Sequence, residues 1–573
     1  MSTDSYSDLV NLFTDPLLAP PEPVIDRSRL AAPYAGLRHL HGKLGDDGPL
    51  LADHVKLRTL LELSAVTDPR LFHAMFLHHC MTIGPAIDYG ADDADVAALA
   101  SARWIGAPLM NELGHGNSSS AIRTEARYDP AAREFVLHTP AAEAVKHPAS
   151  VGLDGVPRLG VVSARLLTGG MDRGTALFLV ALREENGPCP GVRIEPRRQT
   201  PLLTMDYATV RFDQVRVPYS RWLSDGASIG EGGSFHDPLG GPDARTRRSL
   251  SMSRFAWGAV TAALAAVARA SAALALPYAR RRKTFDRFAG ELPAIGHLNQ
   301  QRLLFGATAG ALAATAIAYR ATEPAWHIPP GGGHGAGPSA RVMRELALAK
   351  VTAGVLADET VARCRSASGA LGFFSEGRLI DYQALTLAFQ SAGGDSRLLK
   401  LEAAWAMVNG QDYSPPDDGS APDGWVRLFR VRERLLHAEL TAGLRTAASN
   451  GGTPFDAWND RTELALRFAE AHTARTTAEV LCEEWQAPAV PEAIRSLLAE
   501  LYQLHCLEHA IPHAGWYLAQ RRLTAEEVLS MPEQGDEICR RLAHRADDVT
   551  DLLEIPESLL QGPLNLAWLP GSS

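Results

Sequence analysis

The sequence predicts an α+β chain of several domains: an N-terminal helical domain, a middle β-domain, a helical bundle and an extra C-terminal helical domain. The chain has 573 residues, which is too many for one ordinary hydrophobic core. One β-rich stretch lies between helical stretches, and linkers rich in Pro and Gly divide the remainder. Hydrophobic residues make up 46% and charged residues 21%, which is typical of a folded soluble protein.

Residues 1–105 are predicted to form the N-terminal helical domain. Two segments carry apolar residues at the three- and four-residue spacing of an amphipathic helix, DHVKLRTLLELSAV and PRLFHAMFLHHCMTIG. The pattern changes after Trp104, where short β-rich runs begin. The boundary with the next domain is therefore placed there.

Residues 106–225 are predicted to form a small β-barrel or sandwich. Runs such as EFVLHT, TALFLVALR and ATVRFDQVRVP are separated by Gly, Pro and Asp. In the last run Val210 and Phe212 alternate with Arg211 and Asp213, as expected for a half-buried strand.

Residues 226–424 are predicted to form a helical bundle that begins with a loop over 224–246. Long Ala-rich helices are expected over 250–283 and 293–320, and a third over 341–366 after a Gly- and Pro-rich break at 329–339. The linker 409–424 ends this domain. Residues 425–573, which contain strongly amphipathic segments, are predicted to form the C-terminal helical domain.

Charge and cysteine usage exclude several classes of protein. Lys and Arg total 56 and Asp and Glu total 66, so the net charge of −10 argues against a nucleic-acid or membrane-surface binder. The six cysteines include no CxxC pair, so we expect no disulfide framework and no zinc site. The first residues lack the pattern of a signal peptide, and the apolar stretches Phe255–Ala268 and Leu303–Tyr319 fit buried bundle helices. We expect a cytoplasmic protein without a membrane span.

Clustered histidines do not predict a metal site. His505, His509 and His513 have helical spacing, but Pro512 interrupts the turn and no carboxylate completes a ligand set. The pair His78 and His79 lacks a second ligand pair. Ordinary helix positions explain both clusters, and no metal is expected.

Four segments together resemble the acyl-CoA oxidase family, within the acyl-CoA dehydrogenase superfamily. They are NELGHGNSSSAIRTEARYDPAAREFVLHTP, YARRRKTFDRF, SGALGFFSEGRL and the tail EEVLSMPEQGDEICRRLAHRADDVTDLLEIPESLLQGPL. The first matches the family's TE-x-GHG-x-N stretch, the second its RKTF-like signature and the third its CGGHGYS segment. The resemblance covers almost the whole chain in the right order.

The resemblance implies a bound FAD between the β-domain and the bundle, and a homodimer. The family's RKTF arginine, here Arg282, reaches across the dimer interface to the diphosphate, and its guanidinium suits phosphate. The glycines of the GHG turn allow close approach of a ligand to the backbone. The positions to which the resemblance assigns the cofactor are Asn111, Gly114, Gly116, Asn117, Lys146, His147, Arg282, Thr284, Phe285, Gly369 and Gly372.

The sequence also departs from the family's pattern. Asn111 stands where Thr is usual, Leu298 where Gln is usual, and Lys146-His147-Pro148 where a Lys-Trp-Trp-like stretch is usual. The family's general base is a Glu in a T-x-E-G-D-like segment, and Gly393 takes that position. Some dehydrogenases of the superfamily place their base just before an Arg at the start of a bundle helix, where this chain has Ser253 before Arg254.

Loss of the glutamate leaves three explanations, because oxidation of an acyl thioester requires a base for the α-proton. Glu376 or Asp395 could replace it. A β-keto acid could form its carbanion by decarboxylation, with Lys146, His147 or Arg254 binding its carboxylate. The protein could also have lost catalysis.

The leading hypothesis is therefore an FAD-dependent oxidase that acts on an unusual acyl or β-keto-acid substrate, free or carrier-bound, with O2 as acceptor, in specialised metabolism. One alternative is a flavin-dependent decarboxylase-dehydrogenase-monooxygenase of the epoxyketone-forming type. The alternative from another class is a catalytically inactive subunit of a hetero-oligomer.

Overall fold

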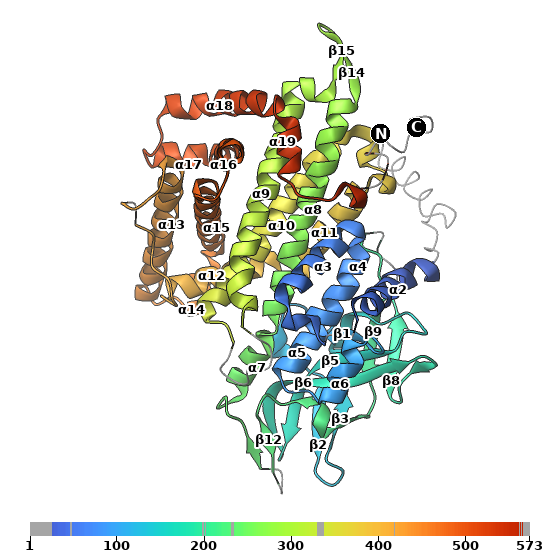
Figure 1. Ribbon diagram of the computed structural model, residues 1–573. Helices are drawn as coiled ribbons and strands as arrows, with labels where there is room; N and C mark the ends of the chain where they lie inside the picture. The colour runs from blue at the N-terminus through green and yellow to red at the C-terminus, as the bar shows by residue number, and fades with distance from the viewer. Residues whose placement is uncertain are drawn as a thin grey trace, which may run out of the picture.

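The computed structural model describes residues 26–45, 48–197, 200, 202–230, 234–328, 337–417, 419–560, 562 and 564. A sheet domain lies at one end of the molecule and long helices extend from it toward the other end (Figure 1). The predicted order of a helical, a β and two further helical regions is confirmed. The first 25 residues of the predicted N-terminal domain, the end of the C-terminal domain and most of the predicted break at 329–339 lie outside the described residues.

The N-terminal helices begin at aspartates. Asp26, Asp53 and Asp68 each accept backbone N–H groups of the first turn that follows, which satisfies donors that have no partner within the helix. The helices are α2 (Arg27–Leu44), α3 (His54–Thr67), α4 (Pro69–Met75), a π-helix (Phe76–Ile83), α5 (Gly84–Asp88) and α6 (Asp93–Ala100). Their apolar side chains share one core with the bundle, so this region has no separate core.

The β-domain consists of two main sheets around their own core. One sheet has eight strands in the order β10-β3-β2-β5-β6-β11, with β1 beside β5 and β7 beside β6, and the other has the order β4-β9-β8. The strands are β1 (Ile105–Leu109), β2 (Glu125–Asp129), β3 (Glu134–His138), β4 (Lys146–Ser150), β5 (Arg158–Thr168), β6 (Met171–Glu184), β7 (Gly187–Pro188), β8 (Val192–Pro196), β9 (Tyr207–Phe212), β10 (Val215–Pro218) and β11 (Trp222–Leu223).

The bundle is built on three helices of 29 residues each, α8 (Ser253–Arg281), α9 (Leu298–Trp326) and α10 (Ala340–Ser368). Small alanine side chains on their buried faces let the helices pack closely. The bundle continues through α11 (Leu379–Ser391) and α12 (Ser396–Val408). By length and composition Pro242–Arg281 and Leu298–Trp326 could cross a membrane, but their most apolar windows are 100% and 67% buried, as predicted for bundle helices.

The C-terminal helices pack against the side of the bundle (Figure 1). They are α13 (Gly424–Ser449), α14 (Pro454–Asn459), α15 (Thr462–Gln486), α16 (Glu492–Ala510), α17 (Ala514–Ala519), α18 (Ala525–Ala543) and α19 (Ala546–Asp551). Ala404 and Met407 of α12 share a core with Leu436 and Phe468 of this region. The packing therefore joins α12 to the C-terminal helices, although the sequence assigns it to the bundle.

Two predictions about local structure were wrong. The segment 224–246, predicted as a loop, contains β12 (Ser228–Ile229), β13 (Phe235–His236) and the start of α7 (Pro242–Leu250). The helix predicted over 250–283 ends two residues early, and the RKTF motif continues into a hairpin of β14 (Lys283–Asp286) and β15 (Gly290–Pro293). Helix α8 ends at Arg281, and this hairpin projects from the end of the molecule opposite the sheet domain (Figure 1).

Candidate active site

The turn that carries the GHG motif is held against the segment before β4. The N–H of Leu113 donates to the carbonyl of Val145 at 2.8 Å, and that of Gly114 donates to Glu143 at 2.9 Å. A Cβ at Gly114 would lie 2.5 Å from the Cβ of Glu143, so only glycine fits. This glycine therefore serves packing within the protein, because its amide is already bonded.

The second half of the turn is open to a ligand. Gly116 is exposed, and a Cβ there would meet nothing within 4 Å. Asn117 has φ +59, and its N–H and that of Gly116 make no backbone hydrogen bond among the described residues. Asn111 is also exposed, and its carbonyl accepts the N–H of His147 at 3.1 Å. Free amides beside an open glycine suit an anionic or planar ligand.

A buried ion pair lies behind this turn. Glu112, which sequence reasoning missed as a site residue, is 3.1 Å from the Nζ of Lys146, and neither side chain is exposed to solvent. The carboxylate also accepts the N–H of Arg123 at 2.9 Å and of Thr124 at 2.8 Å, and the Thr124 hydroxyl at 2.6 Å. The Lys146 ammonium also donates to Ser163 at 3.1 Å. Glu112 is the second residue of the NELGHGN segment. The sequence signal that could have identified it is an acidic residue in this segment together with Lys146, the only lysine of β4.

Burial shifts the pKa values of Lys146 and Glu112 in opposite directions, because it disfavours the charged form of each. Burial lowers the pKa of Lys146 to about 8, although Glu112 favours the charged form. Burial raises the pKa of Glu112, but the Lys146 ammonium and the Thr124 donors outweigh it, so this pKa lies below its ordinary value. Lys146 therefore holds the turn to the sheet from within, and its ammonium does not reach the surface where a cofactor would lie.

His147 is the more accessible residue of the same stretch. It is half-buried, and the peptide bond between it and Pro148 is cis. Burial and the neighbouring Arg197 lower its pKa, so the ring is neutral near pH 7. His147 stays a candidate for contact with a cofactor or substrate.

The second group of predicted cofactor residues meets at the base of the hairpin. Nη1 of Arg282 donates to the carbonyl of Ala367 at 3.1 Å, and a Cβ at Gly369 would lie 3.3 Å from Nη1. No carboxylate pairs with Arg282 among the described residues, whereas Arg280 pairs with Asp547. Arg282 therefore presents a cation with free N–H donors, which is suited to a phosphate.

Of the other predicted residues near Arg282, Thr284 and Gly372 contact neighbouring parts of the protein, and Phe285 is exposed to solvent. The hydroxyl of Thr284 donates to Leu292 at 3.2 Å and lies 2.9 Å from Nε2 of His297. Phe285 is 85% exposed on the hairpin. A Cβ at Gly372 would lie 2.3 Å from the carbonyl oxygen of Arg365, so this glycine is required by packing.

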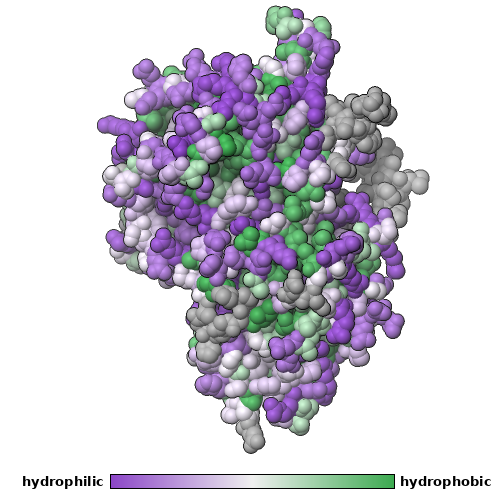
Figure 2. Space-filling model, viewed as in Figure 1, coloured by the Kyte–Doolittle hydropathy of each residue, from purple (hydrophilic) through white to green (hydrophobic). Residues whose placement is uncertain are grey.

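The GHG turn and the residues around Arg282 lie at opposite ends of the folded molecule. The GHG turn belongs to the sheet domain, and Arg282 lies beside β14 at the far end of the bundle (Figure 1). The hairpin tip also carries apolar surface (Figure 2), where Phe285 and Phe288 are 85% and 92% exposed. A single chain therefore does not bring the two groups together.

The loop at Gly393 joins α11 to α12 and contains no carboxylate at the predicted base position. Nε1 of Trp257 donates to the Gly393 carbonyl at 2.7 Å, and Nζ of Lys350 donates to the Gly394 carbonyl at 2.7 Å. Gly393 has φ +65. A Cβ there would lie 3.9 Å from Phe389 and 4.0 Å from Val260, so the space beside it is free although the backbone favours glycine.

Neither proposed replacement for the glutamate is well placed. Glu376 is exposed before α11, and the 13 residues of that helix, at a rise of ~1.5 Å each, separate it from Gly393 by about 20 Å. The Asp395 carboxylate caps α12 and accepts the N–H groups of Arg397 at 2.9 Å and Leu398 at 3.2 Å.

Arg254 is engaged in a buried ion pair. Its Nη2 lies 2.8 Å from both carboxylate oxygens of Asp88, and Nη1 donates to Ile328 at 3.2 Å. Its charge is thus balanced within the protein, as is that of Lys146. Neither cation is free to bind a substrate carboxylate.

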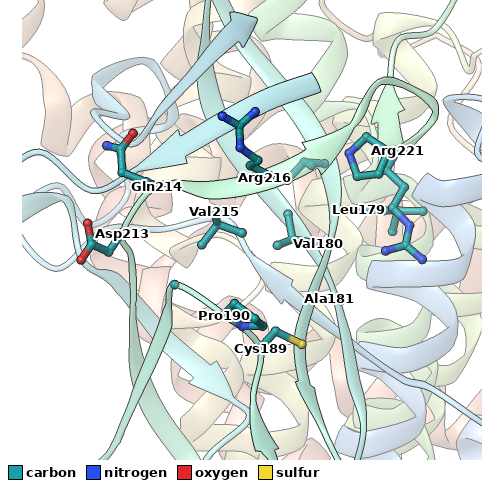
Figure 3. Close-up of a pocket in the computed structure, with 13 residues that line it drawn as sticks. Leu179, Val180, Ala181, Cys189, Pro190, Asp213, Gln214, Val215, Arg216 and Arg221 are labelled. Atoms are coloured by element: carbon teal, nitrogen blue, oxygen red, sulfur yellow. The ribbon is translucent and has the colours of Figure 1, made fainter. Parts of the chain in front are cut away.

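Two cavities lie away from these residues. One, of about 490 Å³, opens on the β-domain between β6 and β10 and is lined by Cys189, Gln214 and Arg216 among others (Figure 3). The other, of about 1020 Å³, lies between the bundle and the C-terminal helices, beside Glu345, His472 and Arg475. No residue of the predicted cofactor set lines either cavity.

Three histidines of the N-terminal region come together. His41, His78 and His79 offer nitrogen atoms within 4.8 Å of one another. However, Nδ1 of His78 accepts the N–H of Gly106 at 2.9 Å, so its proton is on the other nitrogen, which cannot then bind a metal. Nε2 of His41 and of His79 are 3.2 Å apart and share a proton. The cluster is a hydrogen-bonded one.

The fold, a sheet domain joined to a helical bundle and further C-terminal helices, is that of solved acyl-CoA oxidases. Acyl-CoA oxidase1 from Yarrowia lipolytica has the same fold, with a TM-score of 0.82 and 19% identity over 98% of this chain and 87% of that chain. Acyl-CoA oxidase-1 from Caenorhabditis elegans, solved with FAD and ATP, gives a TM-score of 0.79 and 18% identity over 98% and 87%.

The sequence comparisons agree with the fold. Residues 421–565 match the family model described as acyl-CoA oxidase. The acyl-coenzyme A oxidase-like protein of Mus musculus is 24% identical over 83% of this chain and 80% of its own length. Peroxisomal acyl-coenzyme A oxidase 3 of Homo sapiens is 24% identical over 90% and 80%. The chain is therefore similar to acyl-CoA oxidases in its C-terminal sequence, in distant homology over most of its length and in its fold.

Proposed function

We propose that this protein is an FAD-dependent oxidase that removes hydrogen from the α- and β-carbons of an acyl thioester and passes the electrons to O2. The observation that carries the proposal is the pair of half-sites, one at the open GHG turn and one at Arg282. FAD is the expected cofactor, because the family's solved members include complexes with FAD. When bound, FAD accepts a hydride from the substrate.

The residues of both half-sites fit FAD. Arg282 offers a guanidinium without a carboxylate partner for the diphosphate. The amides of Gly116 and Asn117 can donate to the cofactor without loss of an existing backbone hydrogen bond. Because the half-sites lie at opposite ends of one chain, a complete site requires two chains, and a homodimer supplies them most simply. The exposed phenylalanines of the hairpin would be covered in such a dimer.

The test is to purify the protein and measure three properties. Visible absorbance and mass spectrometry of the released cofactor should identify FAD, and light scattering should give a dimer or a larger even assembly. Oxygen consumption should accompany oxidation of an acyl-CoA series. A monomer that takes up no added FAD would refute the proposal, and it would favour the alternative of an inactive subunit.

Two of the three residues that the decarboxylating alternative requires for the substrate carboxylate are already paired within the protein. Lys146 and Arg254 are paired with Glu112 and Asp88, so they do not offer a free charge to a β-keto acid. His147 alone stays available. The alternative would be supported if a β-keto acid released CO2 and took up ¹⁸O from ¹⁸O2.

Substrate, carrier and compartment stay predictions. An unusual acyl chain and a role in specialised metabolism rest on the absent glutamate at Gly393. Several relatives are named peroxisomal, and we keep a cytoplasmic location as a proposal for this chain. Imaging of the tagged protein in its own host would decide it.

A further inference from the structure

His73 lies where the three regions of the chain meet. It is on α4, and its ring packs against Phe76 of the following π-helix at a centroid distance of 6.1 Å. Phe389 of α11 lies 6.1 Å away, and Tyr207 of β9 lies 6.3 Å away in an edge-on arrangement. The N-terminal helices, the bundle and the β-domain therefore each contribute one wall around this imidazole.

The imidazole is buried without a hydrogen-bond partner. Only 8% of His73 is exposed, and no described residue bonds to its buried Nδ1. Burial lowers its pKa to about 4, so the ring is neutral near pH 7 and has a lone pair to accept a proton. A buried polar atom without a partner is costly, and a catalytic role is one explanation for retaining it.

Each other buried histidine of the described chain has at least one ring nitrogen engaged, although Nε2 of His78 and Nδ1 of His79 have no partner. His78 accepts a backbone N–H, and His79 pairs with His41. His472 bridges Glu433 at 2.8 Å and Glu345 at 3.1 Å. His73 differs from them because its neighbours are aromatic rings.

Phe389 connects His73 to the loop that lacks the glutamate. The Phe389 ring lies 6.1 Å from the imidazole between centroids, and a Cβ at Gly393 would lie 3.9 Å from Cδ1 of the same ring. Tyr207 also precedes Ala208, whose strand pairs with β4 beside His147. His73 thus lies between the position of the absent base and the strand that carries the predicted cofactor contacts.

We infer that His73 accepts the α-proton of the substrate in place of the glutamate that is absent at Gly393. The inference rests on the proposed function. The C–H bond at the α-carbon breaks, the proton moves to an imidazole nitrogen of His73, and the electron pair stays on the thioester as its enolate. The reverse transfer regenerates both groups. With an oxidisable substrate, bound FAD would accept the hydride from the β-carbon.

The experiment isolates this proton transfer from oxidation. The probe is a 3-oxaacyl-CoA, whose β-position is an ether oxygen, so no hydride can leave. The holoenzyme is incubated with it in D2O, and mass spectrometry follows deuterium at the α-carbon. His73→Gln should lower the exchange rate by ~10²–10⁴-fold, while FAD content and the Kd of the probe stay unchanged. His73→Asn, whose amide occupies the position of Nδ1, is the second variant if the first does not fold.

Two further measurements separate a proton acceptor from a packing residue. Added imidazole should restore exchange to His73→Ala, because the free base can enter the space left by the ring. In ¹³C-histidine NMR of the wild type, the signal missing from His73→Asn should move toward the imidazolium position when the probe binds. His79→Gln, a buried histidine engaged with His41, is the matched control and should exchange at the wild-type rate.

Each result decides the matter. Exchange at the wild-type rate in both His73 variants would overturn the inference and leave the proposed function standing. Binding of the probe by wild-type protein without exchange would overturn it as well. Failure of the wild-type protein to retain FAD or bind the probe would overturn the proposed function and this inference with it.

Discussion

Glu112→Gln should destabilise the β-domain by an amount that the charge of Lys146 sets. The pKa of Lys146 is about 8 in the folded protein, whereas its ordinary value is 10.5. Burial of this ammonium beside Glu112 therefore already costs about 3 kcal/mol of folding free energy at pH 7. Without Glu112, Lys146 can at worst become neutral, which costs about 5 kcal/mol at pH 7 relative to the unfolded chain. The difference between these two costs, about 1–2 kcal/mol, is the part of the lost folding free energy that the charge of Lys146 causes.

Hydrogen bonds add to this amount. The Glu112 carboxylate accepts three donors from Arg123 and Thr124 besides Lys146, and an amide presents only one acceptor oxygen. A buried donor left without a partner costs ~1–3 kcal/mol. The total loss should therefore be ~2–4 kcal/mol at pH 7.

Hydrogen exchange measured by mass spectrometry is the suitable assay, because a chain with several domains need not unfold in one step. Peptides from β2 and β4 should lose protection in Glu112→Gln while peptides from α15 do not. The control is Lys146→Met alone and with Glu112→Gln. The double variant should lose less than the sum of the single losses, since it leaves no unpaired charge. Additive losses, or a single loss under ~0.5 kcal/mol, would refute the reasoning.

Three other predictions concern the cofactor, the glycine loop and the contact between domains. Arg282→Ala should weaken FAD binding by ~1.5–3 kcal/mol, or roughly 10–100-fold in Kd, as measured by flavin titration, and unchanged affinity would exclude this contact. Gly393→Glu should restore α-proton exchange to His73→Gln but lower the free energy of unfolding by ~1–2 kcal/mol, because φ at this residue is positive. If the folded double variant does not exchange, a base at residue 393 does not reach the α-proton that His73 is proposed to accept. Burial opposes protonation of His472, but Glu433 and Glu345 raise its pKa from 6.5 to about 9, so about 3 kcal/mol of stability should be present below pH 6.5 and lost as pH rises through 9. Thermal unfolding of wild type and His472→Gln at pH 6 and pH 9.5 checks this, and an equal difference at both pH values would contradict it.

The helices of the bundle could be predicted because their pattern is local. Long alanine-rich runs predict α8, α9 and α10 to within about six residues, although Pro277 lies inside α8 and Pro324 inside α9. The β14–β15 hairpin could not be predicted in this way. Helix-favouring Arg and Lys precede it, and its exposed Phe285 has no packing partner within one chain to reveal a strand. A two-stranded hairpin that is exposed on both faces carries little periodic signal of its own.

The site residues were predictable in identity but less so in role. Motif matching located Arg282 and Gly369 far apart in sequence, and the structure places them in contact. It could not distinguish Gly114, which packs on Glu143, from Gly116, which is open, because glycine meets both needs. It also assigned free charges to Lys146 and Arg254, since a linear sequence does not show the carboxylates that fold against them.

The two parts of the proposed chemistry depend on different levels of structure. In the proposed function the cofactor half-sites come from two chains, because the GHG turn and Arg282 lie at opposite ends of the folded molecule. The walls around His73 come from one chain, since α4, α11 and β9 already meet there. Conditions that separate the subunits should therefore release FAD but leave His73 packed against Phe389 and Tyr207. After dilution, flavin fluorescence should report release of FAD, and the His73 NMR signal should match that of undiluted protein stripped of FAD. A difference between these two signals would place His73 at the interface instead.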